Sequence, residues 1–323
     1  MSLLRINSLR TYFKTRSGIA RAVDGISLAI EKGEVLGIVG ESGCGKSVVA
    51  LSILRLLSMP PAYFAGGKIL FKDKDLMELT DNEIRAIRGD RISMIFQEPM
   101  SALNPVYTIG NQLSEVFQVH HKATKKQAME KSLDMLTKVG IPDPLARLKA
   151  YPHQLSGGLR QRVMIAMALG CSPELLIADE PTTALDVTIQ AQILDLITKL
   201  QDDFNTAVII ITHDLGVIAE TTDRVLVMYT GNVMETATTI DLFENPKHPY
   251  TKGLIKAIPS VTSDDSADLY EITGTVPSLF DLPRGCKFNT RCPEALDICR
   301  QKKPKLIQIG KEHKVACWGV NHE

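Results

Sequence analysis

Residues 40 to 47 combine residue types and a spacing that suit phosphate chemistry. In order they are Gly40, Glu41, Ser42, Gly43, Cys44, Gly45, Lys46 and Ser47. Two glycines five positions apart before a lysine and a serine predict a loop whose backbone N–H groups face a phosphate, with no bulky side chain in the way. We expect Lys46 to reach the outer phosphates of a nucleotide and the Ser47 hydroxyl to hold Mg²⁺. The alternative, a chance glycine-rich turn, is weakened by the motifs that follow.

Two carboxylates, Asp179 and Glu180, follow the apolar run 175–178. Carboxylates at the end of an apolar strand are costly to bury unless a cation or hydrogen bonds receive them. Asp179 therefore fits the alignment of Mg²⁺ through water, and Glu180 fits a general base that polarises an attacking water. The alternative, a helix N-cap, is opposed by Pro181 and the turn that follows it.

Two more polar residues, Gln97 and His213, follow apolar runs at 91–96 and 208–212. Ligands bind at the carboxyl edge of an open α/β sheet, where residues following parallel strands come together. Gln97 could there reach a metal ion or a water beside a phosphate. Alone, each residue is a weak signal, because a surface glutamine or a structural histidine after a strand is common.

A second glycine motif, Ser156-Gly157-Gly158, opens an amphipathic helix over 163–169. It would present another set of N–H groups at a helix start. One chain seldom needs two anion-binding loops for one nucleotide. The pair therefore predicts that each loop completes a site on another subunit.

Two aromatic residues, Tyr12 and Phe13, lie between the first predicted strands. An aromatic ring there could stack on a nucleotide base. The alternative is an ordinary core or hairpin aromatic, and only the nucleotide motifs elsewhere favour stacking.

Short apolar runs that suit buried parallel strands must position these residues. They lie at 35–39, 91–96, 175–178 and 208–212. Residues 1–34 predict paired strands, 66–71 a hairpin strand, about 109–150 a Lys-rich helical stretch, and about 188–200 a further helix. The charge run at 122–131 is most simply a solvated helix face.

The composition narrows the class of protein. The 323 residues could form one large domain or two smaller ones, and a hydrophobic fraction of 44% provides an ample core. The chain has 37 Lys and Arg residues and 37 Asp and Glu residues, so it has no net positive charge that would attract nucleic acid. We expect a cytosolic protein without a signal peptide or a membrane span of about 20 residues, whose membrane role requires a partner.

In combination, the motifs resemble those of ABC-type ATPases. The resemblance rests on residues 40–47, Gln97, 155–161, 175–180, Ala184-Leu185-Asp186 and His213. It implies an α/β fold, a P-loop NTPase of the ABC type, with an antiparallel β subdomain, a helical signature subdomain at about 98–170 and a small cysteine-rich C-terminal extension. It also implies that two such domains pair head to tail, with ATP between the phosphate loop of one and the Ser-Gly-Gly helix of the other.

Carried over residue by residue, the resemblance implies a complete catalytic set. Phe13, or its neighbour Tyr12, would stack on adenine. Nucleotide would also contact Gly40, Ser42, Gly43, Cys44, Gly45, Lys46 and Ser47. Gln97 would sense Mg²⁺ and contact the transmembrane partner, Asp179 would align Mg²⁺, and Glu180 would be the base. Ser156, Gly157 and Gly158 would complete the opposite site, Asp186 would line the dimer seam, and His213 would contact the γ-phosphate.

Longer stretches resemble ATPase subunits of dipeptide/oligopeptide importers, specifically the first of two. They are 97–105, 151–154, 245–251 and 285–293. The resemblance implies a heterodimer with a second related ATPase, two permease subunits, an extracytoplasmic peptide-binding protein, and a peripheral place on the cytoplasmic face of the membrane. Nickel importers of the same group are the near alternative. Cys44 departs from the common serine, but it should face the loop interior without loss of function.

We expect an ATPase region over 1–255 and a linker with a cysteine-rich region over 256–323. Four cysteines crowd the tail with the spacing C-x5-C-x6-C-x17-C: Cys286, Cys292, Cys299 and Cys317. Cytosolic cysteines favour metal over disulfides, and this spacing lacks the close pairs of compact zinc sites. Nine Lys/Arg against four Asp/Glu from Arg284 onward could offset a negative cluster. The likeness to peptide-importer tails favours a structural 4Fe–4S cluster, with zinc or unligated thiols as the alternatives.

Overall fold

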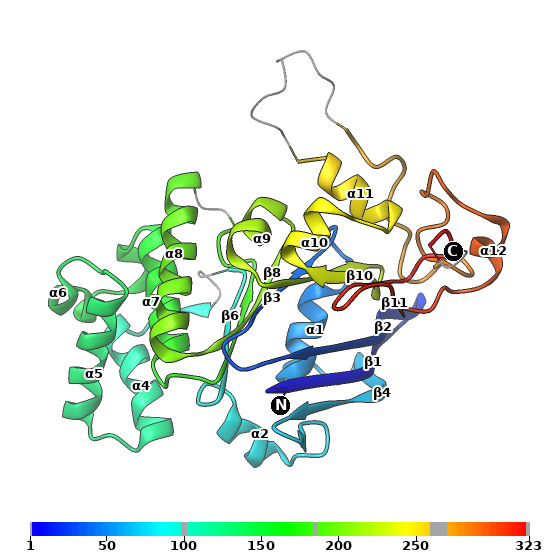
Figure 1. The fold of residues 1–323 in the computed structure, drawn as a ribbon. Helices are drawn as coiled ribbons and strands as arrows, with labels where there is room; N and C mark the ends of the chain where they lie inside the picture. The colour runs from blue at the N-terminus through cyan, green and yellow to red at the C-terminus, as the bar shows by residue number, and fades with distance from the viewer. Residues whose placement is uncertain (1, 99–101, 184–185, 259–269, 321–323) are drawn as a thin grey trace. The chain divides into compact units, whose positions relative to one another are not determined.

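The computed structural model describes residues 2–98, 102–183, 186–258 and 270–320 (Figure 1). Ala184, Leu185 and the predicted linker at 260–268 lie outside these ranges. The chain divides into two compact units. The first comprises Met1–Ile30, Val35–Met77 and Thr212–Glu323, and the second comprises Glu31–Glu34 and Glu78–Ile211.

The first unit contains an antiparallel sheet with the strand order β2-β1-β4-β5. Its strands are β1 (Leu4–Thr15), β2 (Gly18–Ile30), β4 (Ala62–Phe71) and β5 (Lys74–Asp75). On β1, Leu4 and Ile6 are buried and alternate with exposed neighbours, as expected of a sheet with one face on the core. The paired strands predicted over 1–34 and the strand predicted at 66–71 are confirmed.

The same unit contains a second run of paired strands, in the order β11-β12-β10-β9-β3. Strand β3 pairs in parallel with β9, and the other pairs are antiparallel. The strands are β3 (Val35–Val39), β9 (Arg224–Tyr229), β10 (Asn232–Thr238), β11 (Ile307–Gln308) and β12 (Lys314–Val315). The helices are α1 (Lys46–Ile53), α9 (Leu215–Thr221), α10 (Thr239–Glu244), α11 (Pro249–Lys256) and α12 (Asp297–Gln301).

The cysteine-rich tail shares the core of the first unit. Phe288, Cys286 and Cys299 are buried in one hydrophobic cluster with Val227 and Tyr229 of β9. The tail therefore buries apolar surface against the unit that carries the phosphate loop. A segment of this size buries little apolar surface alone, so this shared core contributes to holding the tail folded. The boundary expected near residue 255 stays a prediction.

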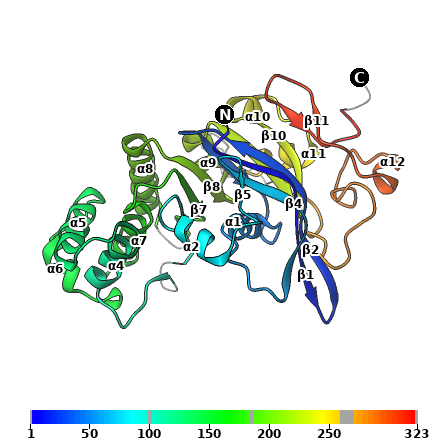
Figure 2. The same ribbon diagram turned by 90° about the horizontal axis from the view of Figure 1, so that it is seen from below.

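The second unit contains three parallel strands in the order β6-β7-β8. They are β6 (Ile92–Ile95), β7 (Leu175–Asp179) and β8 (Ala207–Thr212), whose residues are all buried. The helices are α2 (Asp81–Ile87), α4 (Ile109–His121), α5 (Lys125–Lys138), α6 (Pro144–Lys149), α7 (Gly157–Leu169) and α8 (Val187–Phe204), with a 3-10 turn at Pro152–Gln154. Both views show α4, α5 and α6 gathered beside α7 (Figures 1 and 2). The predicted strands and the helical stretch at 109–150 are confirmed.

Candidate functional site

The loop between β3 and α1 has a backbone that only glycine accommodates at two positions. Gly40 has φ +158° and Gly45 has φ +100°. A Cβ at Gly40 would lie 2.2 Å from the Met228 carbonyl oxygen, and one at Gly45 would lie 2.1 Å from the Ala22 carbonyl oxygen. The glycine spacing seen in the sequence thus follows from close backbone approach at these two positions.

Lys46, the first residue of α1, is buried against this loop. Its Nζ donates to the carbonyl oxygens of Gly40 at 2.7 Å and Glu41 at 3.2 Å. The Cys44 thiol is fully buried, 3.9 Å from the same Nζ, and burial raises its pKa, so it stays neutral. Position 44 therefore faces the loop interior, as the sequence predicted.

The two aromatic candidates on β1 differ in their surroundings. The Tyr12 hydroxyl donates to Asp24 Oδ1 at 2.7 Å, and burial together with this bond raises the pKa of Tyr12 to about 12. Thr11 is within hydrogen-bond distance of Ser52 in α1, at 3.0 Å. The register of β1 shifts against β2 between Thr11 and Phe13 but is unbroken against β4 from Thr11 to Phe13, so by strand alternation Phe13 shares the face of Thr11 and Tyr12 lies on the other. Phe13 is therefore the better candidate for a base bound over the phosphate loop.

In the second unit, Glu180 is held directly after β7. Its backbone has φ +47°, a left-handed conformation that is uncommon for a residue with a side chain. Its Oε2 accepts from Gln97 Nε2 at 2.8 Å and from Thr183 Oγ1 at 2.9 Å. The structure thus brings together Gln97 and Glu180, which the sequence separates by 83 positions. Asp179, the last residue of β7, is buried at 4% exposure.

The Ser-Gly-Gly motif begins α7. Ser156 is the N-cap, and its Oγ accepts from the Leu159 N–H at 3.4 Å. Ser156 and Gly157 are exposed. A Cβ at Gly158 would lie 2.9 Å from Ile189 Cγ2 of α8, so this glycine permits close helix packing. The motif leaves an exposed helix start that another molecule can reach.

Asp186 lies at the start of α8, and His213 lies directly after β8. Asp186 is the N-cap of α8, and its Oδ1 accepts from the Ile189 N–H at 2.9 Å. His213 is an exposed residue after β8 and belongs to the first unit, as does the phosphate loop. Its neighbour Asp214 caps α9. Capping of α8 already accounts for an aspartate at position 186 without a dimer. The place of Asp186 at a dimer seam therefore stays a prediction.

Gln161 has a role that sequence reasoning missed. It is 2% exposed, and its Nε2 donates to the Pro181 carbonyl oxygen at 2.6 Å. Pro181 directly follows Glu180, so α7 is tied to the turn that carries the candidate base. The available signal was a polar residue just before the apolar positions of this helix, where burial requires a hydrogen-bond partner.

The four tail cysteines are neighbours. Cys286 donates its N–H to the Cys299 carbonyl oxygen at 2.8 Å. Burial first, and the other thiols to a smaller extent, raise the pKa of Cys286 and of Cys292 to about 11. The influence on Cys292 comes from Cys286, Cys317 and Cys299 together. Four adjacent sulfur donors, two of them buried, fit a cationic metal centre that would stabilise their thiolates.

The spacing of these sulfurs bears on the kind of metal. Among the described residues, which include all four cysteines, the group of His, Cys, Asp or Glu whose ligand atoms lie within 4.8 Å of one another contains none of them. A single zinc ion with four ligands needs its sulfurs close together. As the structure describes them, the four sulfurs therefore form no preformed zinc site.

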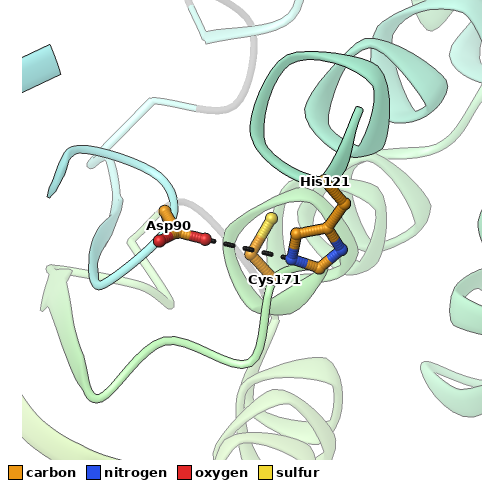
Figure 3. A group of neighbouring side chains, drawn as sticks. All are labelled: Asp90, His121 and Cys171. Atoms are coloured by element: carbon orange, nitrogen blue, oxygen red, sulfur yellow. Dashed lines mark ion pairs between the residues drawn. The ribbon is translucent and has the colours of Figure 1, made fainter. Parts of the chain in front are cut away.

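Cys171, which the sequence left as a bystander, lies with Asp90 and His121 (Figure 3). His121 Nε2 is 3.9 Å from Asp90 Oδ1, and its Nδ1 is 3.4 Å from the Lys131 ammonium. A metal-bound histidine donates its second ring N–H to an acceptor, whereas a lysine offers only donors. Burial, and then Asp90, raise the pKa of Cys171 to about 11. The contact of Lys131 with the second ring nitrogen of His121 is therefore what argues against a cation in this group.

Within the described ranges, none of the helices has the length and apolar character needed to cross a bilayer.

Two family models match the chain. The ABC transporter model covers residues 23–183, and the model of the oligopeptide/dipeptide transporter C-terminal region covers residues 234–299. The second match includes Cys286, Cys292 and Cys299 but ends before Cys317.

Similar proteins cover nearly the whole chain. A probable peptide ABC transporter ATP-binding protein of Sinorhizobium fredii is 54% identical over 99% of this chain and 95% of its own length. The dipeptide transport ATP-binding protein DppD of Bacillus subtilis is 52% identical over 98% of this chain and 94% of its own. Among solved structures, a dimeric ATP-binding cassette in a post-hydrolysis state, bound to ADP and Pi, aligns with a TM-score of 0.66 and 27% identity, over 73% of this chain and 98% of its own.

Proposed function

The chain belongs to the family of ABC transporter ATP-binding proteins, in its oligopeptide and dipeptide group, and from this premise we propose that it is the ATP-hydrolysing subunit of a peptide importer. The observation that carries the proposal is the carboxylate of Glu180. It follows a buried strand and accepts two hydrogen bonds, from Gln97 at 2.8 Å and from Thr183 at 2.9 Å. A general base requires such a fixed carboxylate within reach of a water.

The phosphate loop would bind the triphosphate of ATP through its backbone N–H groups. Lys46, whose ammonium now contacts loop carbonyls, would turn to the outer phosphates, and Phe13 would stack on adenine. Ser47, Gln97 and Asp179 suit Mg²⁺, which supplies positive charge beside the phosphates when bound. Glu180 would take the proton of the attacking water, and His213 would donate to the γ-phosphate.

The exposed helix start at Ser156, Gly157 and Gly158 supports a head-to-tail pair of ATPase domains. We propose a second, related ATPase subunit as the partner, with Asp186 at the seam, on two permease subunits served by an external peptide-binding protein. The chain would then sit peripherally at the cytoplasmic face of the membrane. In this arrangement the isolated chain binds nucleotide but hydrolyses it slowly.

Glu180→Gln tests the catalytic assignment in the assembled transporter. Removing a general base lowers a rate by about 10²–10⁴-fold, while ATP binding should survive because the amide keeps the size of the side chain. Glu174→Gln is the matched control, since Glu174 is a carboxylate at the opposite end of β7, paired with Arg91 at 2.8 Å. A hydrolysis rate in Glu180→Gln equal to that of the control would remove Glu180 from this role.

We also propose that Cys286, Cys292, Cys299 and Cys317 hold a 4Fe–4S cluster with a structural role. The neighbouring thiols support it, and ATP-driven transport requires no redox step. The cluster would add to the apolar contacts that already hold the tail in the first unit.

Anaerobic purification tests this assignment. The protein should be brown, with iron and acid-labile sulfide in near-equal amounts. Replacing Cys299 with serine should bleach it, whereas Cys171→Ser, which removes a thiol outside the tail, should not. Stoichiometric zinc without sulfide would replace iron in this proposal, and protein without any metal would end it.

A further inference from the structure

Glu41, the second residue of the phosphate loop, is held on three sides. Its N–H donates to the Tyr250 hydroxyl at 2.9 Å, and its carbonyl oxygen accepts from Lys46 Nζ at 3.2 Å. Its carboxylate accepts two hydrogen bonds from Arg291 of the tail, at 2.7 Å and 3.0 Å. The loop is therefore bonded directly to a residue that lies 250 positions away in the chain.

Arg291 uses every donor of its guanidinium. Nε donates to the Thr273 carbonyl oxygen at 3.0 Å. Nη1 donates to Glu41 and to the Tyr229 hydroxyl at 3.3 Å, and Nη2 donates to Glu41 and to the Ile272 carbonyl oxygen at 3.1 Å. The side chain is 4% exposed. A bidentate pair between a buried arginine and a partly exposed carboxylate fixes geometry as well as charge.

The tail in turn fixes Arg291. The backbone N–H of Arg291 donates to the Phe288 carbonyl oxygen at 3.0 Å, and its guanidinium carbon lies 6.0 Å from the centre of the Phe288 ring. Phe288 is 1% exposed, and Cys292 directly follows the arginine. The position of the guanidinium thus depends on how the tail folds.

We propose that Arg291 is a positioning residue for the phosphate loop, which holds and neutralises Glu41 so that the loop keeps its shape and carries no unpaired carboxylate where nucleotide phosphates bind. The inference rests on the proposed nucleotide-binding role of this loop. Without Arg291, the Glu41 carboxylate loses its counter-charge and repels the triphosphate, and Glu41 is then held only through its backbone. The tail is then part of the machinery that sets ATP affinity.

The test is a double-mutant cycle in the full chain, read by equilibrium binding of a fluorescent ATP analogue. Arg291→Met should raise the dissociation constant by about tenfold, because an unpaired carboxylate then lies beside bound phosphates. Glu41→Gln alone should change it by about twofold. The double variant should return to within about threefold of the original chain, because the repelling charge is gone.

A purely structural arginine would give a different cycle, with the double variant as weak as Arg291→Met, and that result would overturn the proposal. In the assembled transporter, Arg291→Met should raise KM for ATP with little change in kcat, since the arginine does not touch the reacting atoms. If Arg291→Met does not fold, Arg291→Gln, which keeps one donor group, takes its place in the cycle.

Lys252→Met is the matched control. Lys252 forms an exposed ion pair with Glu294 of the tail at 3.9 Å, so ATP affinity should not change. Lys46→Ala separates the two proposals. If the original chain binds ATP no better than Lys46→Ala, the proposed function fails. If the original chain binds and Arg291→Met matches it, only the role of Arg291 fails.

Discussion

Alanine at Gly45 should damage nucleotide binding far more than alanine at Gly43. Both residues have positive φ, +100° and +75°, which costs a residue with a side chain about 1–2 kcal/mol. A Cβ at Gly43 meets nothing within 4 Å, whereas one at Gly45 would lie 2.1 Å from the Ala22 carbonyl oxygen. Ala22 is a buried residue of β2, so its carbonyl cannot easily move aside, and overpacking adds about 1–3 kcal/mol.

If ATP binds only the present conformation of the loop, these free-energy costs appear as weaker ATP binding. Gly43→Ala should weaken binding by about 5–30-fold, and Gly45→Ala by about 30-fold or more, since 1.4 kcal/mol is a factor of about ten. Titration with a fluorescent ATP analogue measures both, and thermal unfolding without nucleotide shows whether each variant is folded. Equal affinities for the two variants would refute the claim that close backbone approach, and not φ alone, selects Gly45.

Three further changes test other parts of the chain. Burial, and then Lys252, lower the pKa of His248 from 6.5 to about 3, so the unfolded chain binds a proton below pH 6.5 that the folded chain rejects. The free energy of unfolding should therefore be constant for this group above pH 6.5 and fall by about 1.4 kcal/mol per pH unit below it, toward pH 3; an unchanged pH slope of thermal unfolding in His248→Asn would contradict this. Gln161→Met leaves the Pro181 carbonyl oxygen without its buried donor and should cost about 1–3 kcal/mol in denaturant unfolding, with slower hydrolysis; unaltered stability and rate would show that this bond is dispensable. Phe13→Ala should weaken ATP binding by about tenfold, whereas Tyr12→Phe should not, because only Phe13 shares the face toward α1; the reverse order would assign stacking to Tyr12.

Much of the parallel sheet was predictable, because a short run of only apolar residues between turn residues favours a buried strand over other secondary structure. The run 35–39 became β3, and the run 208–212 forms most of β8. The strands of the tail were not predicted. Strands β11 and β12 have two residues each, too few to show a period, and they form through pairing with β10.

The candidate site also has features that the sequence predicts and features that it does not. The phosphate loop could be predicted because glycines and their spacing are a local property of the chain. The contact between Gln97 and Glu180 joins two strand ends, and the bond from Arg291 to Glu41 joins residues 250 positions apart. The first follows from the expected meeting of parallel-strand ends at one sheet edge, whereas no pattern in the sequence reveals the second. Phe13 and Tyr12 stayed equivalent in the sequence because only the neighbours on each face of β1 distinguish them.

Strand β10 has consequences for how the protein can be shortened. Its outer side is paired by the tail, through Glu235 with Val315 and Thr236 with Lys314, and the Ala316 N–H donates to the Met234 carbonyl oxygen at 2.8 Å. A chain ending at residue 258 would expose these backbone groups as an open sheet edge. Open edges recruit strands from other molecules and start aggregation. The tail therefore also acts as protection against self-association, and a truncated ATPase would precipitate even if its nucleotide site were intact.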